Sequence, residues 1–183
     1  MTTMKLSTKD ITQIGMFTAL TAIGAFVSIP VGPVPITLQS FFVLLSGIIL
    51  GPRKAMYSQI AYLLLGLSGL PIFSNFTGGF QAVFKPSFGF LIGYIVIAYL
   101  IGKITESKSN NTNNLMLAVF LGTVVLYIIG IPYMYYILNI MLDKNLNIMQ
   151  VLNMGMFMFI PGDTVKAALA VYVGKKIKGY KGI

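Results

Sequence analysis

The residues with the clearest chemical potential are two opposite charges in the last apolar stretch of the sequence. Asp163 and Lys166 lie in Pro161-Gly-Asp-Thr-Val-Lys166, whereas every other charged residue falls between or beyond the apolar stretches. A separation of three residues places both side chains on one face of a helix, close enough to pair or to share a ligand. Because a charge at the depth of a bilayer is costly, this pair predicts a functional site.

The two residues before the pair interrupt the helix that carries it. Pro161 lacks a backbone donor and Gly162 disfavours a helix interior, so the free N–H groups after them form a helix N-terminus that Asp163 can cap. One interpretation is therefore a kinked helix with a structural ion pair. The other is a binding site, which is favoured because irregular backbone at membrane depth is tolerated where it lines a cavity.

The composition indicates a polytopic membrane protein. Of 183 residues, 56% are hydrophobic and 9% are charged, and the mean hydropathy is +0.85, which is too apolar for a soluble domain. The absence of Cys and His excludes disulfides, thiol catalysis, His-ligated metals and a Ser-His-Asp triad. There is no P-loop sequence for ATP hydrolysis. We interpret the net charge of +9 as a signal for membrane orientation and not for nucleic acid binding, because the basic residues are divided among short loops.

Six apolar segments predict an all-α fold, in which a bundle of six transmembrane helices forms a single domain over residues 1–183. Their bounds, each placed to within about four residues, are 11–29, 36–51, 55–70, 87–102, 115–138 and 148–174. The second and third are short compared with the roughly 20 residues that a spanning helix needs. No convincing small-residue cleavage site follows the first, so we interpret it as a retained helix and not as a signal peptide.

The Lys and Arg residues predict the orientation of these helices. With the N-terminus in the cytoplasm, the outer side carries only Lys85 and Lys144. The inner side then carries ten basic residues, which are Lys5, Lys9, Arg53, Lys54, Lys103, Lys108, Lys175, Lys176, Lys178 and Lys181. Because cytoplasmic loops carry an excess of Lys and Arg, both termini are expected in the cytoplasm. The chain is therefore expected to be a multi-pass protein of the plasma membrane.

Two outer loops have the composition of a lid over a ligand. The first, residues 30–35, is rich in Pro and leads to Thr37 and Gln39 at the outer mouth of the second segment. The second, residues 69–86, is rich in Phe and contains four uncharged polar residues, which are Ser74, Asn75, Thr77 and Gln81. Flat apolar walls with a few fixed hydrogen-bonding groups are typical of a small-molecule site. An interfacial aromatic belt is the alternative, but belts favour Trp and Tyr, which this loop lacks.

Small residues in the first segment predict close helix packing. Gly15 and Ala19 are four residues apart, as are Thr18 and Ala22. Such spacing allows another helix to approach closely. The partner is either another subunit, which would dock on Gly15, Ala19 and Ala22, or a helix of the same bundle.

Three motifs in this order resemble the BioY family of biotin-specific substrate-binding subunits of energy-coupling-factor (ECF) transporters. They are Pro33-Val-Pro-Ile-Thr-Leu-Gln39, then Leu50-Gly-Pro-Arg53 with Gly66-Leu-Ser-Gly-Leu-Pro-Ile-Phe73, and finally Pro161-Gly-Asp-Thr-Val-Lys166. The resemblance implies a six-helix bacterial protein that binds biotin from outside. It also implies docking, through the small residues of the first helix, on a membrane coupling protein that carries two cytoplasmic ABC-type ATPases. ATP hydrolysis there would deliver biotin inward, and no further cofactor, metal or catalytic residue is implied.

The resemblance also assigns roles to individual residues. Asp163 would accept hydrogen bonds from the ureido N–H groups of biotin, while Lys166 would either donate to the ureido carbonyl or orient Asp163. The polar candidates that would complete the binding site are Thr77, Asn75, Gln39 and Gln81. Tyr62 and the loop Phe residues would cover the thiophane ring and the valeryl chain.

The sequence departs from the family pattern around Phe88, which replaces a glycine. Lys85 nearby is either a partner for the ligand carboxylate or a solvated lysine at the interface. Three rival functions stay open on sequence alone. They are a subunit for another vitamin such as thiamine or riboflavin, a membrane enzyme that uses Asp163 as an acid or base, and a scaffold in which the Asp–Lys pair is structural.

Overall fold

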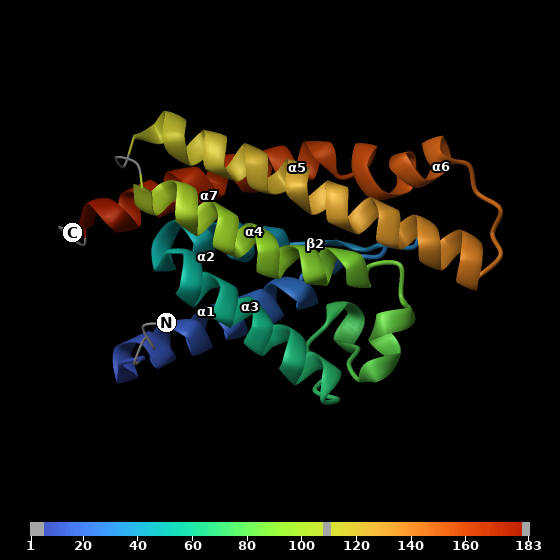
Figure 1. Ribbon diagram of the computed structural model, residues 1–183, viewed down its shortest axis with the longest axis horizontal. Helices are drawn as coiled ribbons and strands as arrows, with labels where there is room; N and C mark the ends of the chain where they lie inside the picture. The colour runs from blue at the N-terminus through green and yellow to red at the C-terminus, as the bar shows by residue number, and fades with distance from the viewer. Residues whose placement is uncertain (1–5, 108–110, 181–183) are drawn as a thin grey trace.

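Helices dominate the computed structural model, which describes residues 6–107 and 111–180 (Figure 1). The longer helices are α1 Thr8–Phe26, α2 Gln39–Leu50, α3 Pro52–Leu67, α4 Phe88–Ser107, α5 Thr112–Tyr136, α6 Ile148–Leu152 and α7 Ile160–Tyr180. Short helical turns are η1 Ser74–Phe76, η2 Phe80–Phe84, η3 Ile137–Met141 and η4 Asn153–Phe157, and one small hairpin pairs β1 Ser28–Ile29 with β2 Ile36–Thr37. The all-α prediction is confirmed.

The six predicted apolar segments coincide with these helices, with two differences. The fourth segment continues as helix to Ser107, and in this extension Thr105 is buried and donates its hydroxyl to Gly102 O at 3.2 Å. The sixth is not one helix. It comprises α6, the wide π-helical turn η4 and α7, so the chain departs from α geometry before Pro161 is reached.

Three helical stretches are long and apolar enough to cross a membrane, which supports a membrane protein. They are Phe88–Glu106, Thr112–Met141 and Ile148–Gly179, while the apolar helix Gln39–Leu50 is shorter. Of the basic residues that the sequence assigns to the inner side, Lys5, Lys108 and Lys181 lie outside the described residues.

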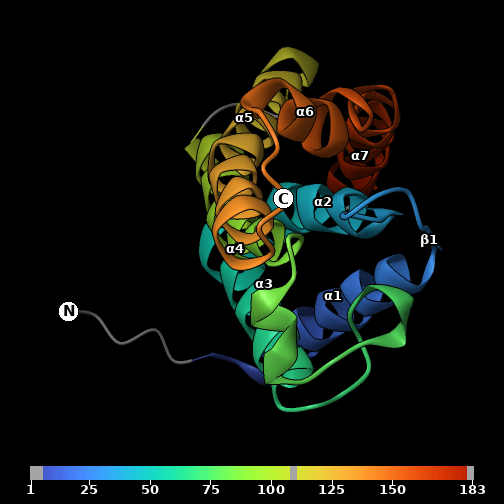
Figure 2. The same ribbon diagram turned by 90° about the vertical axis from the view of Figure 1, so that its right-hand side faces the viewer.

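The bundle has two ends with different contents. One end, here called the termini end, holds the start of α1, the α2–α3 turn, the end of α4, the start of α5 and the end of α7 (Figure 1). The opposite end, here called the loop end, holds the hairpin, the segment between α3 and α4, and the connection from α5 to α6. Short α2 packs against α1, α3, α4 and α7, and Figure 2 shows it between these neighbours.

The central position of α2 explains its composition. Nine of its twelve residues are buried, and a helix that is apolar all round is one that neighbouring helices cover. Its N-terminus is held by backbone contacts with the end of α1, since Leu38 N donates to Gly24 O at 3.0 Å and to Val27 O at 3.1 Å. The hairpin between the two helices thus fixes where α2 begins.

At the termini end, α4 lies directly on the α2–α3 turn. A Cβ atom added at Gly102 would stand 2.5 Å from both Cα and N of Pro52. The turn begins at Gly51, whose φ of +77° favours glycine, and Pro52 starts α3. Backbone therefore meets backbone at this crossing, with no room for a side chain.

We expect Gly102→Ala to destabilise the bundle by about 1–3 kcal/mol, because the new methyl group meets backbone that cannot rotate away. Gly179→Ala in α7 is the matched control, since nothing lies within 4 Å of a Cβ added there. Thermal unfolding of both variants in detergent measures the difference. Equal unfolding temperatures for the two variants would show that the crossing tolerates a methyl group.

Candidate functional site

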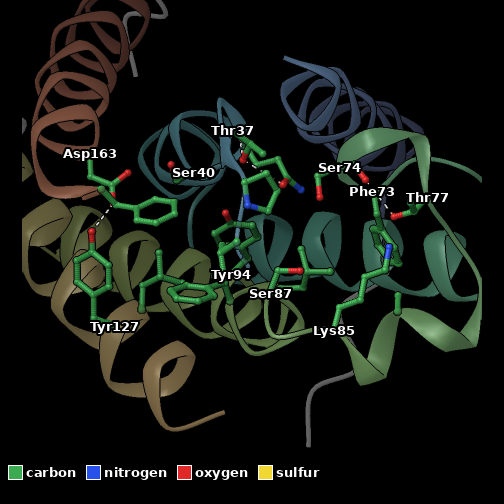
Figure 3. A pocket seen from close by; sticks show the side chains of 18 of the residues that line it. Thr37, Ser40, Phe73, Ser74, Thr77, Lys85, Ser87, Tyr94, Tyr127 and Asp163 are labelled. Atoms are coloured by element: carbon green, nitrogen blue, oxygen red, sulfur yellow. Dashed lines mark hydrogen bonds between the residues drawn. The ribbon is translucent and has the colours of Figure 1, made fainter. Parts of the chain in front are cut away.

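A cavity lies at the loop end, between the starts of α2 and α7 and beside α4 and α5. Its lining changes character along its length, as Figure 3 shows. Figure 3 shows Asp163 and Tyr127 at one side, Tyr94 in the middle, and Ser74, Thr77 and Lys85 at the other side. Lys166 pairs with Asp163, and Phe90 and Phe159 add further aromatic rings to the lining. An elongated ligand with a polar group at each end and an apolar middle would match this order.

All three N–H donors of the Lys166 ammonium have a partner. It lies 2.6 Å from Asp163 Oδ1 and donates to Ser40 Oγ at 2.8 Å and to Thr37 O at 3.1 Å. The side chains of Asp163 and Lys166 are only 13% and 10% exposed. Because an ammonium has three donors, no N–H of Lys166 is left for a further acceptor in this arrangement.

The Asp163 carboxylate is held on its second oxygen by a residue of α5. Tyr127 donates its hydroxyl to Asp163 Oδ2 at 2.5 Å. Asp163 also stands in the first turn of α7, where the helix dipole favours a negative charge. A carboxylate accepts about four hydrogen bonds, so Asp163 keeps acceptor capacity while its orientation is fixed from two sides.

The start of α7 results from the local sequence. Pro161 occupies the first turn, where its missing N–H is no loss, and Asp163 N donates to Phe159 O at 2.8 Å. The π-helical turn η4 immediately before α7 sets the direction from which the chain enters. The break therefore precedes Ile160, and the prediction that it falls at Pro161 and Gly162 is wrong. Asp163 lies within the first turns of α7, with its own N–H already bonded, and does not cap a helix that begins after Gly162.

Gln39 lines the cavity, while Tyr62 lies behind it. Gln39 Nε2 donates to the Tyr62 hydroxyl at 2.7 Å, and that hydroxyl donates to Ile72 O at 2.9 Å. Thr37 Oγ1 donates to Gln39 Oε1 at 3.1 Å. Tyr62 thus connects the start of α2 with the segment after α3, and it supports the cavity without lining it.

The predicted loop residues divide between the cavity and the surface. Thr77 lines the cavity and donates its hydroxyl to Ser74 O at 3.0 Å. Asn75 is exposed, adopts a φ of +57° and accepts a hydrogen bond from Ser28 Oγ at 3.1 Å. Gln81 is also exposed and donates to Gly78 O at 2.6 Å. Neither Asn75 nor Gln81 lines the cavity in this structure, so a contact with ligand would require this loop to move.

Sequence reasoning missed four polar residues of the cavity, which are Ser40, Ser87, Tyr94 and Tyr127. Each had a weak signal, because its polar group stands inside an apolar segment and must find a partner there. Lys85 lines the opposite side of the cavity from Asp163 (Figure 3). Phe88 is buried against Tyr133 and does not line the cavity.

The small residues of α1 face two directions. Gly15 and Ala19 are exposed, and nothing lies within 4 Å of a Cβ added at Gly15. Ala22 is buried in a cluster with Tyr62 and Phe73. Gly15 and Ala19 are thus available to a partner helix, whereas Ala22 packs within the bundle.

Comparison with known proteins gives a consistent match over nearly the whole chain. A family model described as the BioY family matches residues 1–181. A probable biotin transporter BioY of Lysinibacillus sphaericus is 37% identical over 172 residues, covering 93% of this chain and 87% of the relative. The biotin transporter BioY of Thermotoga maritima is 36% identical over 170 residues, covering 93% and 96%.

One solved structure shares the fold. It is the crystal structure of the S-component for biotin from an ECF-type ABC transporter, with a TM-score of 0.83 and 29% sequence identity. The match covers 96% of this chain and 95% of that chain.

We expect Asp163→Asn to destabilise the protein by about 3 kcal/mol, because it leaves the nearly buried Lys166 ammonium without its counter-charge. The double variant Asp163→Asn/Lys166→Met should recover most of this loss, since no charge is then left unpaired. Thermal unfolding in detergent compares both with Asp143→Asn, which neutralises an exposed carboxylate near the loop end. A double variant less stable than Asp163→Asn would mean that Lys166 stabilises the bundle mainly through Thr37 and Ser40.

Proposed function

The chain belongs to the BioY family, and we propose that it is the substrate-binding subunit (S component) that captures biotin for an ECF-type transporter. It is a transport component and not an enzyme, and biotin is its transported ligand and not a cofactor. The observation that carries the proposal is the order of groups along the cavity, with the Asp163–Lys166 pair at one side, aromatic rings in the middle and Lys85 at the other side.

Biotin has the same order of groups. Its ureido ring offers two N–H donors and one carbonyl, its thiophane ring and valeryl chain are apolar, and its far end is a carboxylate. The ureido N–H groups would donate to Asp163, which keeps acceptor capacity. Because the three donors of Lys166 are already used, its role is to orient Asp163 and balance its charge. Phe90, Tyr94 and Phe159 would pack against the apolar part of the ligand.

The carboxylate of biotin would meet Lys85. This lysine lines the cavity beside Ser87 and Thr77, away from Asp163, so a ligand with its ureido ring at Asp163 would direct its acid toward Lys85. The position favours a ligand contact over a purely solvated lysine. Gln39 and Thr77 would supply further hydrogen bonds, with Tyr62 holding Gln39 in place.

The proposed setting is a single domain of six transmembrane helices in the plasma membrane, with both termini in the cytoplasm and the cavity open to the outside. The distribution of charge supports this orientation. Lys85 and Lys144 belong to the loop end, whereas Arg53, Lys54 and Lys103 belong to the termini end. In this proposal α1, α2 and α3 are the other three transmembrane helices, although they are not among the stretches that are long and apolar enough by themselves.

Transport would require an ECF module, proposed here as a membrane coupling protein with two ABC-type ATPase subunits. Gly15 and Ala19 on the exposed face of α1 suit such docking, because small residues allow a partner helix to approach the α1 backbone. ATP hydrolysis in the module would drive delivery of biotin to the cytoplasm.

We expect calorimetry on detergent-purified protein, stripped of co-purified ligand, to show tight binding of one biotin per chain and no binding of thiamine or riboflavin. Thiamine is a cation and would enter a cavity that already holds Lys85 and Lys166. A flavin would need a larger stacking surface. If the folded protein instead binds thiamine or riboflavin in preference to biotin, biotin is not its substrate and the proposal is wrong on this point.

We expect Lys85→Gln to weaken the binding of biotin about tenfold, which corresponds to about 1.4 kcal/mol, and to leave the binding of the neutral biotin amide unchanged. Lys144→Gln removes a charge near the same end of the bundle but outside the cavity, so it is the matched control. The measurement is a calorimetric titration of each variant with both ligands. An equal loss for acid and amide would show that Lys85 shapes the cavity without pairing with the carboxylate.

A further inference from the structure

A second pocket lies at the termini end, where the α2–α3 turn meets the last turns of α4. Its volume is about 300 Å³. Its lining residues, which come from both elements, are Leu50, Pro52, Arg53, Lys54, Tyr99, Lys103 and Glu106. None of these residues belongs to the cavity at the loop end.

The close crossing of α4 over the α2–α3 turn forms this pocket. Because Gly102 lies directly on Pro52, the next residue of α4, Lys103, is brought beside the first turn of α3, where Arg53 and Lys54 stand. The first residues of α3 line this pocket, and the positive end of the helix dipole adds a partial positive charge there. The basic groups therefore converge on one pocket and are not merely spread along a membrane surface.

The charges in and around the pocket do not balance. Lys54 is paired with Asp10 at 3.0 Å and also donates to Gln13 at 2.9 Å. Hydrogen bonds from Ser7 and then from Lys54 lower the pKa of Asp10 to about 2, so Asp10 is charged at neutral pH. Glu106 is the other carboxylate, and it also interacts with Lys178 of α7. Among the described residues, three cations line the pocket and Glu106 is its lining carboxylate. With Asp10 beside Lys54 also counted, the positive charges exceed the negative ones by one.

Apolar side chains extend from this pocket along the outside of the bundle. On α4, Ile92, Val96 and Tyr99 are 37%, 43% and 40% exposed and precede exposed Lys103 with helical spacing. On neighbouring α3, Tyr57 and Leu64 are exposed on the face that begins at Arg53. We call these two rows the α3–α4 apolar face. In a membrane this face contacts hydrocarbon, with Tyr and the basic residues at its polar boundary.

We propose that the pocket binds the phosphodiester headgroup of an anionic phospholipid, whose acyl chains lie along the α3–α4 apolar face. A phosphodiester carries one negative charge, which matches the surplus positive charge, and basic pockets between helices at a membrane boundary suit lipid headgroups. A free phosphate would leave the adjoining apolar face unused. This inference depends on the bundle lying in a membrane and is independent of which vitamin the cavity captures.

Native mass spectrometry of the detergent-purified protein tests this site. The protein is titrated with phosphatidylglycerol and, separately, with phosphatidylcholine of the same acyl chains. We expect one phosphatidylglycerol to bind at least fivefold more tightly than phosphatidylcholine. Lys103→Gln should weaken phosphatidylglycerol about fivefold, the effect of one basic residue near an anionic lipid. Lys176→Gln is the matched control, because it removes an exposed basic residue of α7 outside the pocket.

Two further measurements separate a loss of lipid binding from a loss of folding or of biotin binding. Lys103→Arg preserves the charge and should bind phosphatidylglycerol like the unmodified protein. Lys103→Gln should keep its thermal stability and its biotin affinity, because Lys103 is exposed and does not line the cavity.

Several results would overturn the lipid site. Equal losses in Lys103→Gln and Lys176→Gln would mean diffuse attraction to basic residues, and equal binding of the two lipids would exclude headgroup recognition. Displacement of phosphatidylglycerol by millimolar inorganic phosphate would indicate a site for a free anion. Unchanged lipid binding in Lys103→Gln together with loss of co-purification with a coupling module would indicate a protein interface instead.

Discussion

The ammonium group of Lys166 is the constraint on which the arrangement of the loop end depends. It lies in a nearly buried position where each of its three N–H donors must find a partner, and it finds them on two different parts of the chain. Asp163 is on its own helix, but Thr37 belongs to the hairpin and Ser40 to the first turn of α2. Satisfying this one cation therefore brings the start of α7, the hairpin and the start of α2 together. The cavity is the space that remains between them.

The same contacts would prepare the cavity for the proposed ligand. Asp163 is oriented by Lys166 on one oxygen and by Tyr127 on the other, so its direction is fixed before any ligand arrives. Gln39 is likewise held by Tyr62, which is itself bound to the segment after α3. Groups that are already ordered lose little conformational freedom on binding, which favours tight capture of a scarce small molecule. Under the proposed function, polar residues that do not touch the ligand would thus contribute to its affinity.

The two ends of the bundle differ in how closely their helices pack. At the loop end the helices diverge around polar groups, and the wide turn before α7 leaves room for a cavity. At the termini end Gly102 allows α4 to lie on Pro52, which closes the core and gathers basic residues at its edge. Between these ends lies α2, which packs against α1, α3, α4 and α7 and supplies Ser40 to the cavity and Leu50 to the pocket at the termini end.

The sequence by itself determined the helical class, the approximate extent of the apolar segments, and the Asp163–Lys166 pair, because each is a local signal. Hydropathy is a property of a segment, and the three-residue spacing of Asp163 and Lys166 fixes their shared face once a helix forms. The Pro-rich composition of residues 30–35 and the polar residues of the loop at residues 69–86 were also evident from the sequence of those segments. Local pattern did not reveal the interruption of the sixth segment at η4, since no Pro or Gly pair begins that turn.

Only the tertiary structure decided which polar groups meet. Tyr127 reaches Asp163 from another helix, Ser40 reaches Lys166 across 126 residues of chain, and Tyr62 proves to lie behind the cavity. The small residues of α1 gave no hint that Ala22 is buried while Gly15 and Ala19 are exposed. The physical reason is that a partner's identity depends on how helices rotate and cross. Those rotations are set by packing over the whole bundle and not by the sequence of any one segment.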